Sequence, residues 1–137
     1  MQANLRWQGG MQFVAEADSG HALVIDGPPD MGGRNTGVRP MEMILMGLGG
    51  CTAIDVVHIL KKARQAVEDV DVQLQAERAD TDPKVFTKIN VHFVVKGQGL
   101  KEKQVARAVE LSAEKYCSAS IMLRGSVEIT HSHEIVE

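Results

Sequence analysis

Aromatic side chains are scarce in this sequence, which holds one Trp, one Tyr and three Phe among 137 residues. A hydrophobic core must therefore be built from Val, Ile, Leu and Ala, together with the seven Met. The hydrophobic share of 44% is enough for one core, and the chain length is typical of one domain. We expect a single domain spanning residues 1–137.

Positive charge is not in excess either. The chain has 15 Lys and Arg against 18 Asp and Glu, and no basic cluster, which argues against a nucleic-acid partner. No stretch approaches 18 uninterrupted apolar residues, so we expect no membrane-spanning segment. The first residues do not show a charged segment followed by an apolar one, so we expect a cytoplasmic protein without an export signal.

Cysteine occurs only at Cys51 and Cys117, and the two do not form a Cys-x-x-Cys motif. Free cysteines are among the most buried residue types, so the residues alone favour two inert thiols in the core. A reactive pair is the alternative. Cys117 precedes a segment that could open a helical turn, whose free N–H groups favour a thiolate. Cys51 is followed one and two turns later by Asp55 and His58, which act in opposite directions on a thiolate.

Short β-prone runs alternate with glycine turns in the first third of the chain. The expected strands are residues 4–8, 12–17 and 22–26, which form a meander of hairpins. Residues 27–39 are rich in Pro, Gly and Asn and predict a long loop. Long loops inside compact domains often carry functional residues.

A long central helix is expected to begin at Pro40. Proline suits the first helical position, and Glu42 suits the positive first turn. Apolar residues keep helical spacing as far as Leu60, where lysines follow. The segment 47–50 contains three glycines, each of which costs about 1 kcal/mol relative to Ala. Close packing against another backbone would explain them, and we therefore expect a buried central helix.

The second half of the chain predicts a hairpin, two helices and a last strand. Residues 69–79 and 85–95 alternate apolar and polar side chains around a Thr-Asp-Pro turn. The fold class is therefore α+β, with an antiparallel β-meander, a central buried helix, a hairpin, a second helix and a closing strand. The remaining elements are a second helix at 101–116, a short helix at 118–123 and a strand at 126–136.

Both cysteines lie in segments with a recognisable pattern. Residues 40–51 begin with Pro and an acidic residue and reach Cys51 after a stretch of small residues. Residues 113–120, Ala-Glu-Lys-Tyr-Cys-Ser-Ala-Ser, contain the second cysteine. The pair resembles the OsmC/Ohr family, osmotically inducible protein C and organic hydroperoxide resistance. The order of elements matches as well, so the resemblance covers essentially the whole chain, and it is strongest to the small OsmC-like proteins of unassigned function.

The resemblance implies a homodimer whose intertwined sheets are completed by both chains, and a thiol-dependent, peroxiredoxin-like peroxidase. In the peroxidase branch, one cysteine attacks a peroxide and a second resolves the sulfenic acid as a disulfide. By position, Cys51 matches the attacking cysteine and Cys117 the resolving one. Glu42 and Arg34 are the candidates for the charged pair that favours the thiolate. The implied partners are an organic hydroperoxide and a dithiol reductant, and no cofactor is implied.

Three departures from the peroxidase branch keep a second hypothesis open. The branch has its Glu ten residues before the attacking cysteine, where this chain has Met41, and Glu42 comes one position later. One residue turns a helical side chain by about 100°. Neither Arg34 nor Arg39 falls at matching spacing, and Ser118 replaces a frequent proline. The alternative is a non-catalytic OsmC-like homodimer that binds an apolar small molecule or senses redox state.

Histidine and methionine offer weaker candidates. His131 and His133 share a strand face and could join His92 or His58 as zinc ligands, but no Cys or carboxylate completes a known spacing, so we expect no metal. Methionines could line an apolar ligand pocket, although core filling is the favoured interpretation. The four that cluster in the first half are Met31, Met41, Met43 and Met46.

Overall fold

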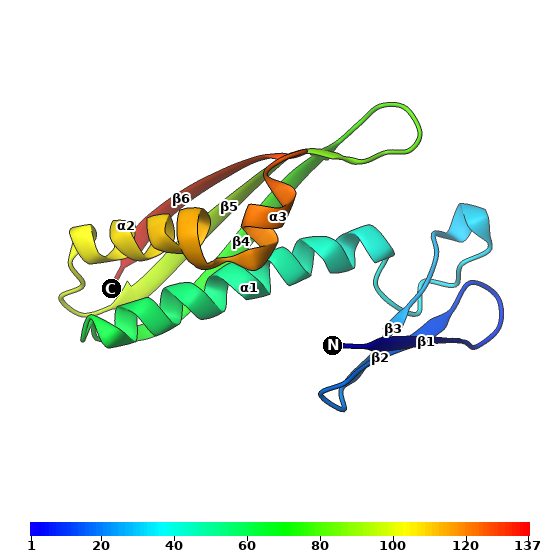
Figure 1. Cartoon of the computed structure of the whole chain (residues 1–137), viewed down its shortest axis with the longest axis horizontal. Coiled ribbons are helices and arrows are strands. Elements are labelled where there is room, and N and C mark those ends of the chain that lie inside the picture. Colours follow the sequence, from blue (N-terminus) through cyan, green and yellow to red (C-terminus); the bar gives the residue numbers. More distant parts are fainter. The chain divides into compact units, whose positions relative to one another are not determined.

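A computed structural model describes every residue from Met1 to Glu137 and confirms the α+β class (Figure 1). The chain forms two three-stranded sheets and three α-helices. It divides into two compact units, Met1–Ile44 and Leu45–Glu137, so the single domain expected over residues 1–137 stays a prediction. The elements are β1 (Ala3–Trp7), β2 (Phe13–Ala17), β3 (Ala22–Ile25), η1 (Pro29–Met31), α1 (Pro40–Lys62), β4 (Val67–Arg78), β5 (Phe86–Gly97), α2 (Glu102–Leu111), η2 (Ser112–Tyr116), α3 (Ser118–Leu123) and β6 (Glu128–Val136).

The N-terminal unit contains the predicted meander. Strands β1, β2 and β3 pair in sequence order and antiparallel, with Trp7 opposite Phe13 and Ala15 opposite Leu23. The loop that follows contains one turn of 3-10 helix, η1, which the sequence pattern did not predict. Its first residue is Pro29, whose ring fixes a backbone angle compatible with such a turn.

A buried carboxylate organises this loop. Asp26 is 1% exposed, and its oxygens accept hydrogen bonds from the backbone N–H groups of Gly27 (2.8 Å), Arg34 (3.1 Å) and Thr36 (3.1 Å). The Thr36 hydroxyl donates a fourth bond at 2.6 Å. That hydroxyl bond, with the three backbone bonds, outweighs the opposing effect of burial and lowers the pKa of Asp26 to about 2. The ionised carboxylate therefore holds the two ends of the loop together.

Acid is expected to destabilise the N-terminal unit through Asp26. The pKa of this group is lower in the folded chain than in the unfolded chain, so its stabilisation is complete above about pH 4 and is lost as the pH falls toward 2. Fluorescence of Trp7, the only Trp and a β1 residue, reports unfolding of this unit in urea at each pH. Asp26→Asn should flatten the pH dependence, whereas Asp30→Asn, at an exposed position, should not. Identical profiles for wild type and Asp26→Asn would contradict this assignment.

The C-terminal unit has a mixed sheet. Strands β4 and β5 form the predicted antiparallel hairpin, with Val72 opposite Phe93, and β6 pairs with β5 in parallel. A parallel neighbour requires a crossover connection. Here α2, η2 and α3 provide it, because they lie between β5 and β6 in the chain. The sequence pattern predicted the last strand but not its parallel pairing.

The core of this unit lies between the sheet and its helices. Alternate side chains of β5 are buried, and those of Val91, Phe93 and Val95 have no exposed surface. Figure 1 shows α1 and α2 on the same side of the sheet. They contribute the buried side chains Leu48, Val56 and Leu60 from α1, and Val105, Ala108 and Val109 from α2.

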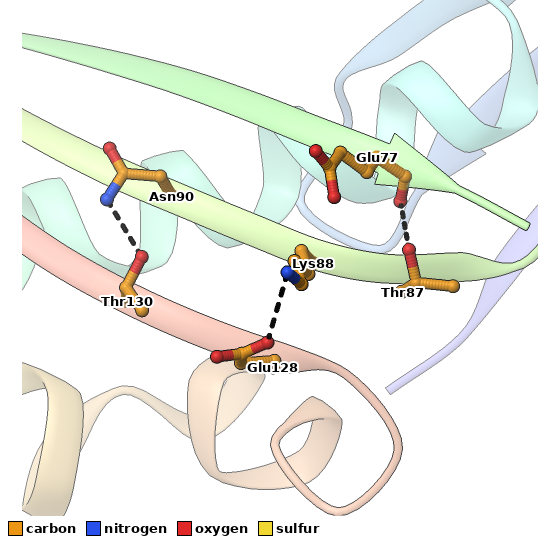
Figure 2. A network of polar contacts seen from close by, with 6 residues as sticks. All are labelled: Glu77, Thr87, Lys88, Asn90, Glu128 and Thr130. Atoms are coloured by element: carbon orange, nitrogen blue, oxygen red, sulfur yellow. Dashed lines mark hydrogen bonds and ion pairs between the residues drawn. The ribbon is translucent and has the colours of Figure 1, made fainter.

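The opposite face of the sheet is polar (Figure 2). The Asn90 side-chain amide donates to the Thr130 hydroxyl at 2.8 Å, and Lys88 lies 3.9 Å from Glu128 in an exposed ion pair. Cross-strand polar pairs of this kind are typical of a face in contact with water. The sheet therefore presents only one face to the core.

Burial of α1 is one-sided in the single chain. Gly49 is closely packed, but against a side chain and not against the expected backbone, since a Cβ at this position would lie 2.6 Å from Leu74 Cδ1 on β4. Gly47 and Gly50, in contrast, have nothing within 4 Å of such a Cβ. None of the methionines is among the buried hydrophobic residues, so core filling by Met was wrong for this chain, and Met46 on α1 is 50% exposed. One face of α1 is thus apolar and uncovered.

The composition of α1 is also that of a membrane-crossing helix. Its 23 residues contain a window of mean hydropathy 1.8, long and apolar enough to cross a bilayer by these two criteria alone. Core helices of water-soluble proteins meet the same criteria. The finding therefore identifies a helix that needs an apolar neighbour, without identifying that neighbour.

Candidate active site: two neighbouring thiols

The structure brings Cys51 and Cys117 together. Cys51 lies in the middle of α1 and is partly exposed, whereas Cys117 lies between η2 and α3 and is completely buried. Each thiol acts on the pKa of the other, so the two side chains are near neighbours. Two cysteines that are distant in the sequence thus form one polar site inside the C-terminal unit.

A change in helix geometry places Cys117. The sequence pattern predicts one regular helix over 101–116, but α2 ends at Leu111 and the chain continues as a π-helix over Ser112–Tyr116. The Cys117 N–H donates to the Ser112 carbonyl at 2.8 Å, and the backbone then becomes extended at Cys117. Short π-helical turns are rare and are frequently found at functional sites. This wider turn places the Cys117 thiol at the start of α3.

Buried hydroxyl groups attach the π-helix to α1. Thr52 Oγ1 lies 2.7 Å from Ser112 Oγ, and Ser112 Oγ donates to Asp55 Oδ2 at 3.0 Å. Both Thr52 and Ser112 have no exposed surface, so their polar groups depend on each other for hydrogen bonding. The sequence pattern missed this pair. The only sequence signal for this pair is Thr52, a small polar residue that directly follows Cys51 and lies on an otherwise apolar helix face.

The environment of Cys51 favours its thiolate. Burial acts to raise the pKa of this thiol, but the Ala119 backbone N–H, the Cys117 side chain and the Ser118 hydroxyl outweigh it, and the pKa is lowered. The Ser118 oxygen lies 3.7 Å from Cys51 Sγ. Asp55 opposes the shift through its negative charge, as its position one turn later predicts.

The environment of Cys117 favours its protonated form. Burial is the largest cause and raises the pKa of this thiol, and the neighbouring Cys51 raises it further. The Ser120 N–H, which donates to Cys117 Sγ at 3.3 Å, and the Ser120 side chain act in the other direction without offsetting burial. The predicted turn after Cys117 is present, and its Ser120 N–H acts on the pKa in the expected direction, but burial outweighs it.

Removal of the Ser118 hydroxyl should make Cys51 less reactive. Ser118→Ala deletes one of the donors that lower the pKa of Cys51, so the thiolate fraction at neutral pH should fall. One neutral hydrogen bond contributes about 0.5–1.5 kcal/mol, which predicts roughly two- to tenfold slower alkylation of Cys51. Iodoacetamide labelling followed by peptide mass spectrometry measures this rate. Ser126→Ala, which removes an exposed serine hydroxyl outside the thiol pair, is the control. Unchanged labelling in Ser118→Ala would contradict this role.

The two charged candidates lie in the N-terminal unit and have partners within it. Glu42 Oε1 accepts the Arg39 N–H at 2.8 Å, three residues earlier, and so caps the start of α1. The Arg34 N–H donates to Asp26, and its guanidinium group lies beside Gly10. The groups that lower the pKa of Cys51 are neutral donors. The predicted roles of Glu42 and Arg34 at the thiol stay predictions.

Two of the four candidate zinc ligands, His92 and His133, have other partners. His133 Nε2 lies 2.6 Å from Glu102 Oε1, and His92 Nδ1 lies 2.8 Å from Ser132 Oγ. His131 Nε2 is buried without a partner, and burial lowers the pKa of this imidazole. The structure holds no group of three or more His, Cys, Asp or Glu arranged to bind a metal.

Comparison with known proteins agrees with this fold. The family model described as OsmC-like protein matches residues 33–132. Protein YhfA of Escherichia coli K12 is 52% identical over 99% of this chain and 98% of its own length. A hypothetical protein from Aquifex aeolicus VF5 is 32% identical, with a TM-score of 0.87 over 98% of this chain and 95% of that one. The organic hydroperoxide resistance protein OsmC from Legionella pneumophila is 22% identical and shares the fold, with a TM-score of 0.70 over 97% and 95% of the two chains. The chain therefore belongs to the OsmC-like protein family.

Proposed function

We propose that this protein reduces organic hydroperoxides, with Cys51 as the attacking thiolate and Cys117 as the resolving thiol. The observation that carries the proposal is the opposite environment of two neighbouring thiols. Cys51 is partly exposed and has a lowered pKa, whereas Cys117 is buried and has a raised pKa. Only a thiolate is a competent nucleophile, so this difference supports Cys51 as the attacking residue and Cys117 as the resolving one.

Family membership supports a role in oxidative-stress defence. The Legionella pneumophila relative is named for organic hydroperoxide resistance, and a second such protein, from Elizabethkingia anophelis, also shares the fold. An apolar face of α1 borders the thiol, with Ile54 72% exposed. Apolar surroundings favour an organic hydroperoxide over hydrogen peroxide, because they desolvate the organic group.

The proposed reduction of a hydroperoxide takes place in three steps. The Cys51 thiolate attacks the distal peroxide oxygen, an S–O bond forms, the O–O bond breaks, and the organic part leaves as an alcohol after taking a proton. The Cys117 sulfur then attacks the Cys51 sulfenic acid, which releases water and forms the disulfide. A dithiol reductant restores both thiols by exchange and is itself oxidised to a disulfide. A cytoplasmic location suits this cycle, because the final step needs a reducing compartment.

A direct test combines turnover with disulfide mapping. The purified protein should consume cumene hydroperoxide in the presence of a dithiol, measured by stopped flow. After substoichiometric peroxide without reductant, peptide mass spectrometry should find a Cys51–Cys117 disulfide. Absence of the disulfide and of turnover would overturn the proposal.

Two observations favour a second candidate, a non-catalytic dimer that senses redox state. Glu42 caps its own helix, and Asp55 opposes a thiolate at Cys51. A sensor would form the same disulfide once but would not turn over with a dithiol. Disulfide formation without multiple turnovers would therefore favour the sensor.

The uncovered face of α1 supports a homodimer. Gly47, Gly50 and Ile54 repeat at three- and four-residue spacing, so they share one face, and the two glycines leave room for another backbone. Exposed apolar surface of this extent on one helix is normally covered by a partner. A second copy of the same chain presents the same apolar face and could pack helix against helix.

A single charge on this face should prevent dimerisation. We expect light scattering to give about twice the chain mass of 14.9 kDa for wild type. Ile54→Glu places a carboxylate in the proposed interface and should give a monomer, because burying an unpaired charge is costly. Lys103→Glu, at an exposed position on α2 and outside the apolar face of α1, is a charge-reversal control and should remain dimeric. A monomeric wild type, or a dimeric Ile54→Glu, would overturn the proposed interface.

A further inference from the structure

A groove runs between α1 and α2, outside the thiol pair. It has a volume of about 580 Å³, within the usual range for small-molecule sites. One wall is a stripe of α1 and the other is α2 with the π-helix. The lining side chains are Asp55, His58, Ile59, Lys62 and Ala63 on the first wall, and Gln104, Arg107, Leu111 and Tyr116 on the second.

The two walls run antiparallel, which gives the groove two different ends. Ser112, at the end of α2, bonds to Asp55, so this end lies beside the thiol pair. At the other end, the Lys101 N–H donates to Gln65 Oε1 at 3.0 Å, just before α2 and just after α1. Figure 1 shows α2 alongside the second half of α1 in this way. Lys62 therefore lines the end away from the thiols, and Asp55 lines the end next to them.

Charge in the groove follows this direction. Lys62 and Arg107 are exposed cations, and neither takes part in an ion pair. Asp55 is the one acidic side chain in the lining, and it accepts the Ser112 hydroxyl at the opposite end. Between the two ends lie the apolar side chains of Ile59 and Leu111. Two free cations, Lys62 at the end away from the thiols and Arg107 near the middle of α2, together with the apolar surface beside them, match a molecule with an apolar body and one negative group.

We propose that this groove binds a small organic anion, a carboxylate or sulfonate with an apolar body. Arg107 and Lys62 bind the anionic group, since a guanidinium can donate two parallel hydrogen bonds to a carboxylate. The apolar body lies over Ile59 and Leu111 and extends toward Tyr116. Asp55 excludes a second negative group at the thiol end by repulsion. This binding is separate from peroxide reduction and does not depend on it.

Octanoate is the probe for this proposal, with octanamide as its neutral counterpart. Isothermal titration of the full-length protein should show octanoate binding at least about tenfold more tightly than octanamide, a difference of about 1.4 kcal/mol. Amide chemical-shift changes caused by octanoate should centre on 55–63 and 104–116. No octanoate binding, or equal affinity for the two compounds, would overturn the proposal.

Matched variants test the assigned cations. Arg107→Gln, at an exposed position, should weaken octanoate binding about tenfold or more while leaving octanamide binding unchanged. Lys103→Gln removes an exposed cation from the same helix outside the groove and should leave octanoate binding unchanged. The Cys51→Ser protein should still bind octanoate, which separates this site from the thiol chemistry. Unaltered octanoate affinity in Arg107→Gln, or equal weakening by Lys103→Gln, would refute the site.

Discussion

Cys51→Ser is expected to abolish reduction of cumene hydroperoxide, with turnover at least about a hundredfold slower than in wild type. A serine hydroxyl does not ionise near neutral pH, so the donors that lower the pKa of Cys51 have no thiolate to stabilise. Stopped-flow measurement of peroxide loss with a dithiol gives both rates. Equal slow turnover in the two proteins would remove Cys51 from the reaction.

Cys117→Ser is the matched control and should behave differently. Cys51 remains reactive, so a single equivalent of peroxide is still consumed, but the sulfenic acid has no neighbouring thiol to resolve it. Excess peroxide should then carry Cys51 to sulfinic and sulfonic acids, which intact-mass spectrometry detects as added oxygen atoms. If the two variants are instead indistinguishable, the order assigned to the thiols is wrong.

Phe93→Ala is expected to give the largest loss of stability, about 3–5 kcal/mol in the free energy of unfolding. Phe93 has no exposed surface and lies on β5, the middle strand, between Val72 of β4 and His133 of β6. Removing the ring leaves a cavity that the surrounding strands cannot close. Urea unfolding followed by far-ultraviolet circular dichroism measures the change.

Val94→Ala tests whether the loss of stability in Phe93→Ala comes from packing in the core. Val94 is the next residue of the same strand, and its half-buried side chain points to the opposite face of the sheet. Its replacement should cost clearly less than that of Phe93, because little packing is lost. Similar losses in the two variants would contradict the one-sided core of this sheet.

The order of elements could be predicted from the sequence because each carries its own local pattern. Alternation marked the hairpin strands, and glycine turns marked the meander, whose structure follows the prediction closely. The short helix expected over 118–123 is α3. The parallel pairing of β6 could not be predicted, because register between distant strands is decided by tertiary contacts.

The sequence by itself determined the family and the α+β class. The cysteine-containing segments and the strand and helix patterns are local features, so they can be recognised from the order of the residues alone. Only the tertiary structure decided which thiol has the lowered pKa. The effect of burial and the donors from Ser118 and Ala119 arise from residues far from Cys51 in the chain, which the π-helix over Ser112–Tyr116 brings beside it. A pKa depends on the groups within a few ångströms in space, and those neighbours exist only after the chain has folded.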